Sequence, residues 1–287
     1  MVRMQDLKPK VLLTAAAGAF FVLYGPVLRR LAQDWLHDDN YSHGVLIVPL
    51  AAYFVWERRR RLATIVPAPS MFGLVFIAGG LAMLLAGMLG AELFLARFSM
   101  IPVLIGSLLF VLGWRALRIL AFPLGFLLLM IPIPAIIFNQ IAFPLQLVAS
   151  QVGEAGLSAM GVPVLREGNV MILARTTLEV AEACSGIRSL ISLLTLGIVF
   201  GYFTDSRTSV RTGIALAAIP VAILTNGLRV AGTGVAAHYI GPEAAEGFFH
   251  TFSGWLVFLL AFVLMFIIAR LLLRMMPLRT APTPSAA

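Results

Sequence analysis

Cysteine is almost absent from the sequence, since Cys184 is the only one in 287 residues. A single thiol forms no disulfide within the chain, so the small disulfide-stapled scaffolds of secreted proteins are excluded. No cluster of residues with metal-ligand spacing and no glycine-rich nucleotide loop occurs either. We therefore expect neither a metal nor another cofactor.

Charge is scarce as well. Charged residues make up 12% of the chain against 60% hydrophobic residues, and the mean hydropathy is +0.97. These values exclude a soluble globular domain and indicate a polytopic membrane protein. The net charge of +8 comes from short basic clusters between apolar runs, which favours membrane topology over nucleic-acid binding as its explanation.

The apolar runs predict an all-α polytopic fold of about eight transmembrane helices, because about 20 apolar residues cross the hydrocarbon core. The runs are 11–28, 43–56, 71–90, 98–114, 117–138, 184–203, 212–231 and 250–273. Most Lys and Arg residues fall between them on one side, which predicts cytoplasmic N- and C-termini. We expect the first run to remain as a helix, and residues 277–287 to form a disordered cytoplasmic tail.

The longest segment between these runs, residues 139–183, is predicted on the outer side. Apolar residues from Ile141 to Val152 recur at helical spacing, which predicts an amphipathic helix on the membrane surface. Residues 162–173 then read as strand, turn and strand, a small β-hairpin. Two interpretations of the hairpin remain open: it shapes a groove for an extended peptide, or it is a packed connector.

This topology brings the unusual polar residues to one membrane level. Cys184 starts the sixth run at its outer end, and His250 starts the eighth. Asn226 and Arg229, three residues apart, share a face near the outer end of the seventh. The segment around His43 precedes the second run on the same side.

The grouping suits cysteine chemistry, because a helix N-terminus and neighbouring Arg or His acidify a thiol. His250 would act as general base and then as acid, with His43 as the rival base. Arg229 is always protonated, so its role would be to stabilise negative charge or grip a substrate carbonyl or carboxylate. Asn226 would orient one of these groups, and Gly186 would permit close backbone approach.

Other interpretations apply to the same residues. A lone cysteine is often an apolar packing residue, and an arginine near a helix end can extend to lipid head groups. A transporter would use Arg229, His250 and His43 as a substrate or proton site. A membrane acyltransferase would use His and Arg but leave Cys184 without a part. The placement of these groups at the outer level, away from the bilayer midplane, favours the enzyme.

At these residues the chain resembles the exosortase/archaeosortase family of multi-pass cysteine transpeptidases. The resemblance rests on an ordered set of motifs over roughly residues 30–272. The motifs are Asn40-Tyr41-Ser42-His43-Gly44 followed by Pro49, Glu182-Ala183-Cys184-Ser185-Gly186-Ile187-Arg188, Asn226-Gly227-Leu228-Arg229, and His250 followed by Ser253-Gly254.

The resemblance implies a protein-sorting enzyme of a Gram-negative inner membrane with its active site facing the periplasm, linked to exopolysaccharide production. Its substrates would be exported proteins ending in a Pro-Glu-Pro signal, a hydrophobic helix and a basic tail. Residues 1–276 would form a single exosortase domain, with 139–183 periplasmic and no added C-terminal domain. Cys184 would be the nucleophile, Arg229 the catalytic arginine and His250 its histidine partner. The supporting or substrate-binding residues would be Asn226, His43, Tyr41, Ser42, Glu182, Ser185, Gly186 and Arg188.

Overall fold

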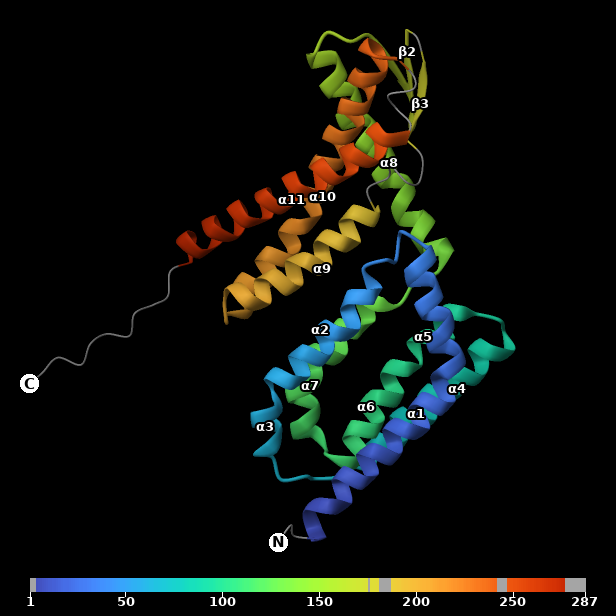
Figure 1. The fold of residues 1–287 in the computed structure, drawn as a ribbon, viewed down its shortest axis with the longest axis vertical. Coiled ribbons are helices and arrows are strands. Elements are labelled where there is room, and N and C mark those ends of the chain that lie inside the picture. The colour runs from blue at the N-terminus through green and yellow to red at the C-terminus, as the bar shows by residue number, and fades with distance from the viewer. Residues whose placement is uncertain (1–3, 175, 181–186, 242–246, 277–287) are drawn as a thin grey trace, which may run out of the picture. The chain divides into compact units, whose positions relative to one another are not determined.

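The chain folds into two compact units, Met1–Pro134 and Ala135–Ala287, shown in a computed structural model (Figure 1). The structure describes residues 4–174, 176–180, 187–241 and 247–276. The first unit contains α1 (Met4–His37), α2 (Gly44–Glu57), α3 (Arg59–Ala63), α4 (Phe72–Leu89), α5 (Leu93–Phe98), α6 (Met100–Val111), α7 (Trp114–Phe126) and the 3-10 helix η1 (Leu127–Met130). The second contains α8 (Ala135–Ala159), β1 (Val164–Glu167), β2 (Val170–Leu173), β3 (Thr177–Glu179), α9 (Ile187–Thr204), α10 (Thr208–Tyr239) and α11 (Gly247–Met275).

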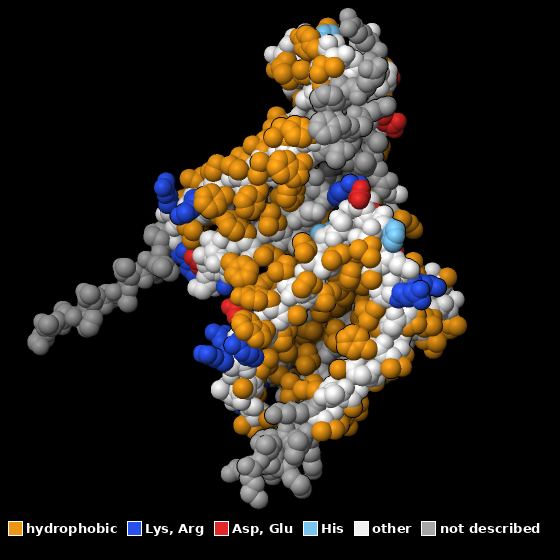
Figure 2. Space-filling view, viewed as in Figure 1, with side chains coloured by type: hydrophobic (Ala, Val, Ile, Leu, Met, Phe, Trp, Pro, Cys, Tyr) orange, Lys and Arg blue, Asp and Glu red, His pale blue; other side chains and the backbone are white. Residues whose placement is uncertain are grey.

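The helices confirm an all-α polytopic membrane protein. Within the described ranges, seven helical segments are long and apolar enough to cross a membrane, and α2 is a shorter apolar helix. Large apolar side chains face outward along them (Figure 2), with Val22 83% and Leu89 80% exposed. Such surfaces suit hydrocarbon, because a soluble monomer rarely exposes contiguous apolar area of this extent.

The predicted segment 117–138 is divided. Its helix ends in η1 at Met130, and α8 begins only at Ala135. Pro132 and Pro134 cause the break, because each lacks an N–H and disfavours helical geometry in the residue before it. The helix predicted over 141–152 is confirmed, but as part of α8, whose 25 residues are themselves apolar enough to span a membrane.

The predicted hairpin is confirmed and is part of a three-stranded antiparallel sheet in the order β1-β2-β3. Glu167 pairs with Val170, which leaves Gly168 and Asn169 as a two-residue turn. Gly168 has φ +65°, and glycine adopts this left-handed conformation without a steric penalty. The third strand was not predicted, because three residues carry too little alternation to be recognised.

The sheet is fixed to α8 and α10 by a buried cluster and two polar contacts. Met171, Val180 and Val230 share this cluster with residues of α8. The Ser150 hydroxyl donates to the Gly168 carbonyl at 2.9 Å, and Arg166 Nε donates to Glu154 Oε2 at 2.7 Å. The strand that leads toward Cys184 is thereby held against α10.

Helix α10 contacts α8 so closely that glycine is required at the contact. A Cβ on Gly227 would overlap the side chain of Val152, and one on Gly153 would lie 2.6 Å from Val230 Cγ1. Farther along, a Cβ on Gly234 would lie 2.8 Å from Leu157 Cδ1. Small residues that let backbones approach are the usual means of packing helices in membranes, where burial of apolar side chains gives little driving force.

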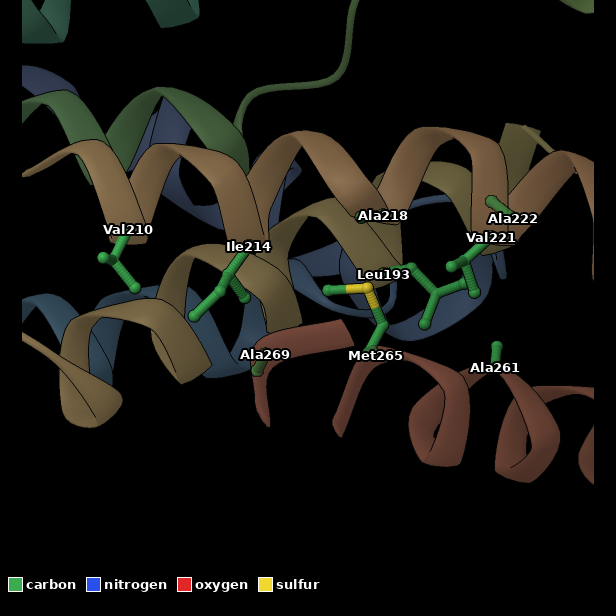
Figure 3. Close-up of a cluster of buried hydrophobic side chains, with 9 residues drawn as sticks. All are labelled: Leu193, Val210, Ile214, Ala218, Val221, Ala222, Ala261, Met265 and Ala269. Carbon is green, nitrogen blue, oxygen red and sulfur yellow. The ribbon is translucent and has the colours of Figure 1, made fainter. Parts of the chain in front are cut away.

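On another side α10 packs against α9 and α11. Leu193 of α9, Ile214 of α10 and Met265 of α11 are fully or almost fully buried in one cluster (Figure 3). Small residues complete it, including Ala218, Ala261 and Ala269. Since α10 contacts α8, α9 and α11, it is the central helix of the second unit.

We predict that Gly227→Ala destabilises the protein and that Gly232→Ala does not. The new methyl at Gly227 meets the stiff, β-branched Val152, and such overpacking costs about 1–3 kcal/mol. Gly232, on the same helix, has nothing within 4 Å of a Cβ, so its substitution gains up to about 1 kcal/mol of helix propensity. Thermal unfolding of both variants in detergent measures the difference. Equal melting temperatures would contradict the close α8–α10 contact.

Candidate active site

Asn226 and Arg229 lie on α10 within the second unit. The Asn226 side chain is 3% exposed, and Arg229 is half-buried with its Nε atom fully enclosed. Their spacing of three residues puts both side chains on one face of the helix. Placing a buried amide and a half-buried guanidinium on a membrane helix costs free energy, so such residues are candidates for a functional role.

Arg229 extends from α10 to the beginning of α11. A Cβ on Gly254 would lie 3.7 Å from both Cζ and Nη2 of Arg229, so the guanidinium packs beside the bare backbone of Gly254. His250 is the fourth residue of α11 and precedes Gly254 by four, a spacing that puts the two positions on one helix face. The His250 side chain lies outside what the structure describes, but its backbone position is one turn from the arginine contact.

The predicted nucleophile, Cys184, lies outside the described residues. So do three of its predicted supporting neighbours, Glu182, Ser185 and Gly186. Both flanks of this segment are described. On one side, the Val180 N–H donates to the Asn169 carbonyl at 2.8 Å, and Val180 packs in the cluster that contains Val230, the residue after Arg229. On the other side, Ile187 is 1% exposed at the start of α9, and Arg188 is half-buried beside it.

The position of Val180 limits how far Cys184 can lie from α10. Val180 is four residues before Cys184, and four extended residues span at most about 14 Å. The last described residue before this segment, Val180, packs against the part of α10 that follows Arg229. The helix that follows, α9, begins three residues after the cysteine.

His43, Tyr41 and Ser42 belong to the first unit, in the turn before α2. His43 Nε2 donates to the Leu129 carbonyl at 3.2 Å, and the Tyr41 hydroxyl donates to the Ile133 carbonyl at 3.4 Å. Since a carbonyl only accepts, the proton of the His43 ring lies on Nε2. Its Nδ1 is buried and has no hydrogen-bond partner. The Ser42 hydroxyl, in contrast, is exposed and donates to the Asp39 carbonyl.

Trp35 completes this arrangement, although its role was not predicted from the sequence. Its Nε1 donates to the Met130 carbonyl at 2.9 Å, and its indole fills the space beside Gly44, where any Cβ would overlap the ring. Side chains of Trp35, Tyr41 and His43 thus supply donors to the helix break between η1 and α8. In the sequence, Pro132 and Pro134 could have indicated that such donors are needed, because a proline break leaves carbonyls without helical N–H partners.

The chemistry open to the described residues is that of a guanidinium beside the beginning of α11. No group of three His, Cys, Asp or Glu side chains that could hold a metal ion is found in the described part of the chain. The guanidinium of Arg229 presents a fixed fork of N–H donors suited to a carbonyl or carboxylate oxygen.

We predict that His43→Ala destabilises the protein more than His43→Gln. Alanine leaves the Leu129 carbonyl without its donor, which costs about 1–3 kcal/mol for a buried group, whereas glutamine retains an N–H at a similar reach. Thermal unfolding of the two variants measures this difference. If both melt as the wild type does, His43 has no structural role at the helix break.

Comparison with known proteins identifies the family. A model of transmembrane exosortases matches residues 35–267, which is most of the chain and covers parts of both units. The matched range agrees with the resemblance over residues 30–272 and contains every predicted site residue. Comparisons with curated proteins and with solved structures found no match. The chain belongs to the transmembrane exosortase family, whose members are membrane enzymes of protein sorting.

Proposed function

We propose that the protein is a cysteine peptidase or transpeptidase that cleaves C-terminal sorting signals of exported proteins, with Cys184, Arg229 and His250 as catalytic residues. The observation that carries the proposal is the contact of the Arg229 guanidinium with Gly254, one helical turn from His250. Family membership supports a membrane enzyme acting on exported proteins. The remaining assignments rest on the chemistry below.

Cys184 is the proposed nucleophile because of what surrounds its segment. The start of α9 lies three residues downstream, and the partial positive charge of a helix N-terminus favours a thiolate nearby. A helix N-terminus also suits the oxyanion that forms when a carbonyl is attacked. No other residue of the chain is a thiol.

Arg229 is proposed to bind the developing oxyanion or the substrate backbone. Its depth fits this role, since it follows Thr208 by 21 residues, a helical rise of about 32 Å that matches the hydrocarbon core. The side chain therefore reaches the membrane boundary opposite the Arg207 end of α10. Its Nε atom is enclosed by protein, and in such surroundings each N–H···O bond to developing charge counts for more than in bulk solvent.

His250 is proposed as the general base and acid in preference to His43. Its helix position adjoins the arginine contact, whereas the His43 ring already donates to Leu129 at the helix break. Because its Nε2 proton is donated to the Leu129 carbonyl, His43 is assigned a structural role. Asn226, buried on the Arg229 face, would orient the arginine or the peptide.

The proposed reaction has two stages. The Cys184 thiolate attacks the carbonyl carbon of the scissile peptide bond, the C–N bond breaks, and His250 gives a proton to the leaving amine. The N-terminal product stays on Cys184 as a thioester. Water or an amine then attacks the thioester and gives its proton to His250, the C–S bond breaks, and the Cys184 thiolate is restored beside protonated His250. A carboxyl terminus on the product indicates hydrolysis, and an amide linkage indicates transfer.

The substrate is proposed to be an exported protein ending in a Pro-Glu-Pro signal, a hydrophobic helix and a basic tail. Its helix would lie in the bilayer beside the apolar faces of this enzyme, which fixes the depth of the scissile bond and lowers the entropic cost of attack. The signal would lie extended near β3, an exposed strand that precedes the Cys184 segment. In a Gram-negative cell this site would face the periplasm from the inner membrane.

We predict that Cys184→Ala, Arg229→Ala and His250→Ala each lower processing of a co-expressed signal-bearing substrate at least about 100-fold. Cys184→Ser should fail as well, because a serine hydroxyl is a far weaker nucleophile without a lowered pKa. His43→Gln should keep most of the activity. Immunoblotting of the substrate before and after loss of its C-terminal anchor measures processing.

Two controls belong to this experiment. His37→Ala removes an exposed histidine that bonds only to Gln33 of its own helix, and should process normally. Gly254→Ala should be tolerated because its methyl would sit 3.7 Å from the guanidinium, whereas Gly254→Val should displace Arg229 and lose activity. Normal processing by Cys184→Ala would refute the nucleophile, and normal processing by Gly254→Val would refute the arginine contact as a catalytic feature.

A further inference from the structure

A cavity of about 320 Å³ lies in the first unit, far in sequence from all of the proposed catalytic residues. It is formed by the second half of α1, the end of α4, the turn that follows α4, and α5. The residues that carry the argument are Leu23, Val27, Arg30, Met88, Leu93 and Arg97. Four of these six are apolar and two are arginines, so the cavity combines an apolar wall with cationic groups.

The two arginines differ in how they are held. Arg97 is 4% exposed and donates to Asp34 Oδ2 at 2.5 Å, so its charge is largely neutralised by that carboxylate. Arg30 is exposed, and within the described residues it makes no hydrogen bond or ion pair with the protein. A guanidinium that lines a cavity and keeps all of its donors available is suited to a planar or tetrahedral oxyanion.

Other charges near the cavity do not cancel that of Arg30. Glu92 accepts the Leu95 N–H at 2.7 Å as the N-cap of α5, and its carboxylate does not line the cavity. Arg29, next to Arg30, is exposed and does not line it either. Counting Arg29, Arg30 and Arg97 against Asp34 and Glu92, the region carries one net positive charge.

The depth of the cavity matches the level of lipid phosphates. Arg30 follows Val11, where the apolar span of α1 begins, by a helical rise of about 28 Å, close to the thickness of the hydrocarbon core. Leu23 and Val27 lie on the hydrocarbon side of Arg30 along α1, and Met88 lies in the last turn of the apolar helix α4. Met88 is 67% and Leu23 46% exposed, so this wall is open to the bilayer from the side.

We propose that this cavity binds one anionic phospholipid, with its phosphate on Arg30 and an acyl chain against Leu23, Val27 and Met88. An amphipathic ligand fits because a free anion would leave the apolar wall unused, and a zwitterionic lipid would bring a cationic head group into a region that is already positive. A membrane lipid is present at this depth at high local concentration. The proposal is independent of the catalytic assignment, since none of its residues belongs to the proposed active site.

The test compares Arg30→Gln with Arg29→Gln as a matched control. The full-length protein in a neutral detergent is titrated with phosphatidylglycerol, phosphatidylcholine or glycerol phosphate, and bound lipid is counted by native mass spectrometry. One phosphatidylglycerol should bind the wild type and Arg29→Gln with similar affinity. Arg30→Gln should bind it at least about tenfold more weakly, because a charge-assisted contact is lost.

Each other outcome overturns the proposal. Equal weakening by Arg29→Gln would mean diffuse attraction to a basic surface. Equal binding of phosphatidylcholine would mean that the net charge of the lipid is not recognised. Saturable binding of glycerol phosphate with similar affinity would identify a site for a soluble phosphate, and unchanged binding to Arg30→Gln would remove the arginine from the site. Thermal unfolding of both variants without lipid verifies that each is folded.

Discussion

The contact between α8 and α10 is the constraint on which the second unit depends. Gly153 and Gly227 let the two backbones approach to a distance that no other residue would permit. In hydrocarbon, dispersion forces at such close range replace the burial of apolar side chains that holds soluble helices together. The contact fixes the level of Arg229 relative to α8, and α8 carries the sheet through Ser150 and Glu154. The strand that leads to Cys184 and the helix that carries Arg229 are therefore positioned by the same packing.

The polar motifs along the chain differ in what their side chains contact. The turn with Tyr41 and His43 caps a proline break, because carbonyls at 129, 130 and 133 need donors that the broken helix cannot supply. The Asn226 and Arg229 pair instead places polar groups where α10 passes the start of α11. A polar motif in a membrane protein can thus serve to satisfy broken backbone, and the contacts of its side chains show where it does so.

Long features were predictable from the sequence, and short ones were not. Hydropathy marked most of the spans, since runs such as 71–90 have a single physical explanation in a bilayer, and Gly168-Asn169 marked the hairpin turn. Strand β3 has three residues, too few for a periodic signal. The extension of α10 to Tyr239, beyond the predicted end at 231, follows a stretch of small residues whose hydropathy is weak but whose packing on α8 favours the helix.

The sequence proposes the members of the candidate site but does not give their contacts. Arg229 was expected near His250 from topology alone, while its passage beside Gly254 depends on how α10 and α11 pack. The sequence left His43 as a rival base, because a sequence does not reveal that the Leu129 carbonyl accepts its ring N–H. Trp35 gave no signal, since a tryptophan near a membrane boundary is ordinarily an interfacial anchor.

Trapping the acyl-enzyme tests the central claim most directly. The full-length protein is mixed with a signal-bearing substrate, quenched in acid during turnover, digested and analysed by mass spectrometry. Our account predicts a thioester on Cys184 that carries the substrate up to the cleaved bond, sensitive to hydroxylamine and absent from Cys184→Ala. Substrate cleavage with no adduct on Cys184, or with an adduct on another residue, would contradict it.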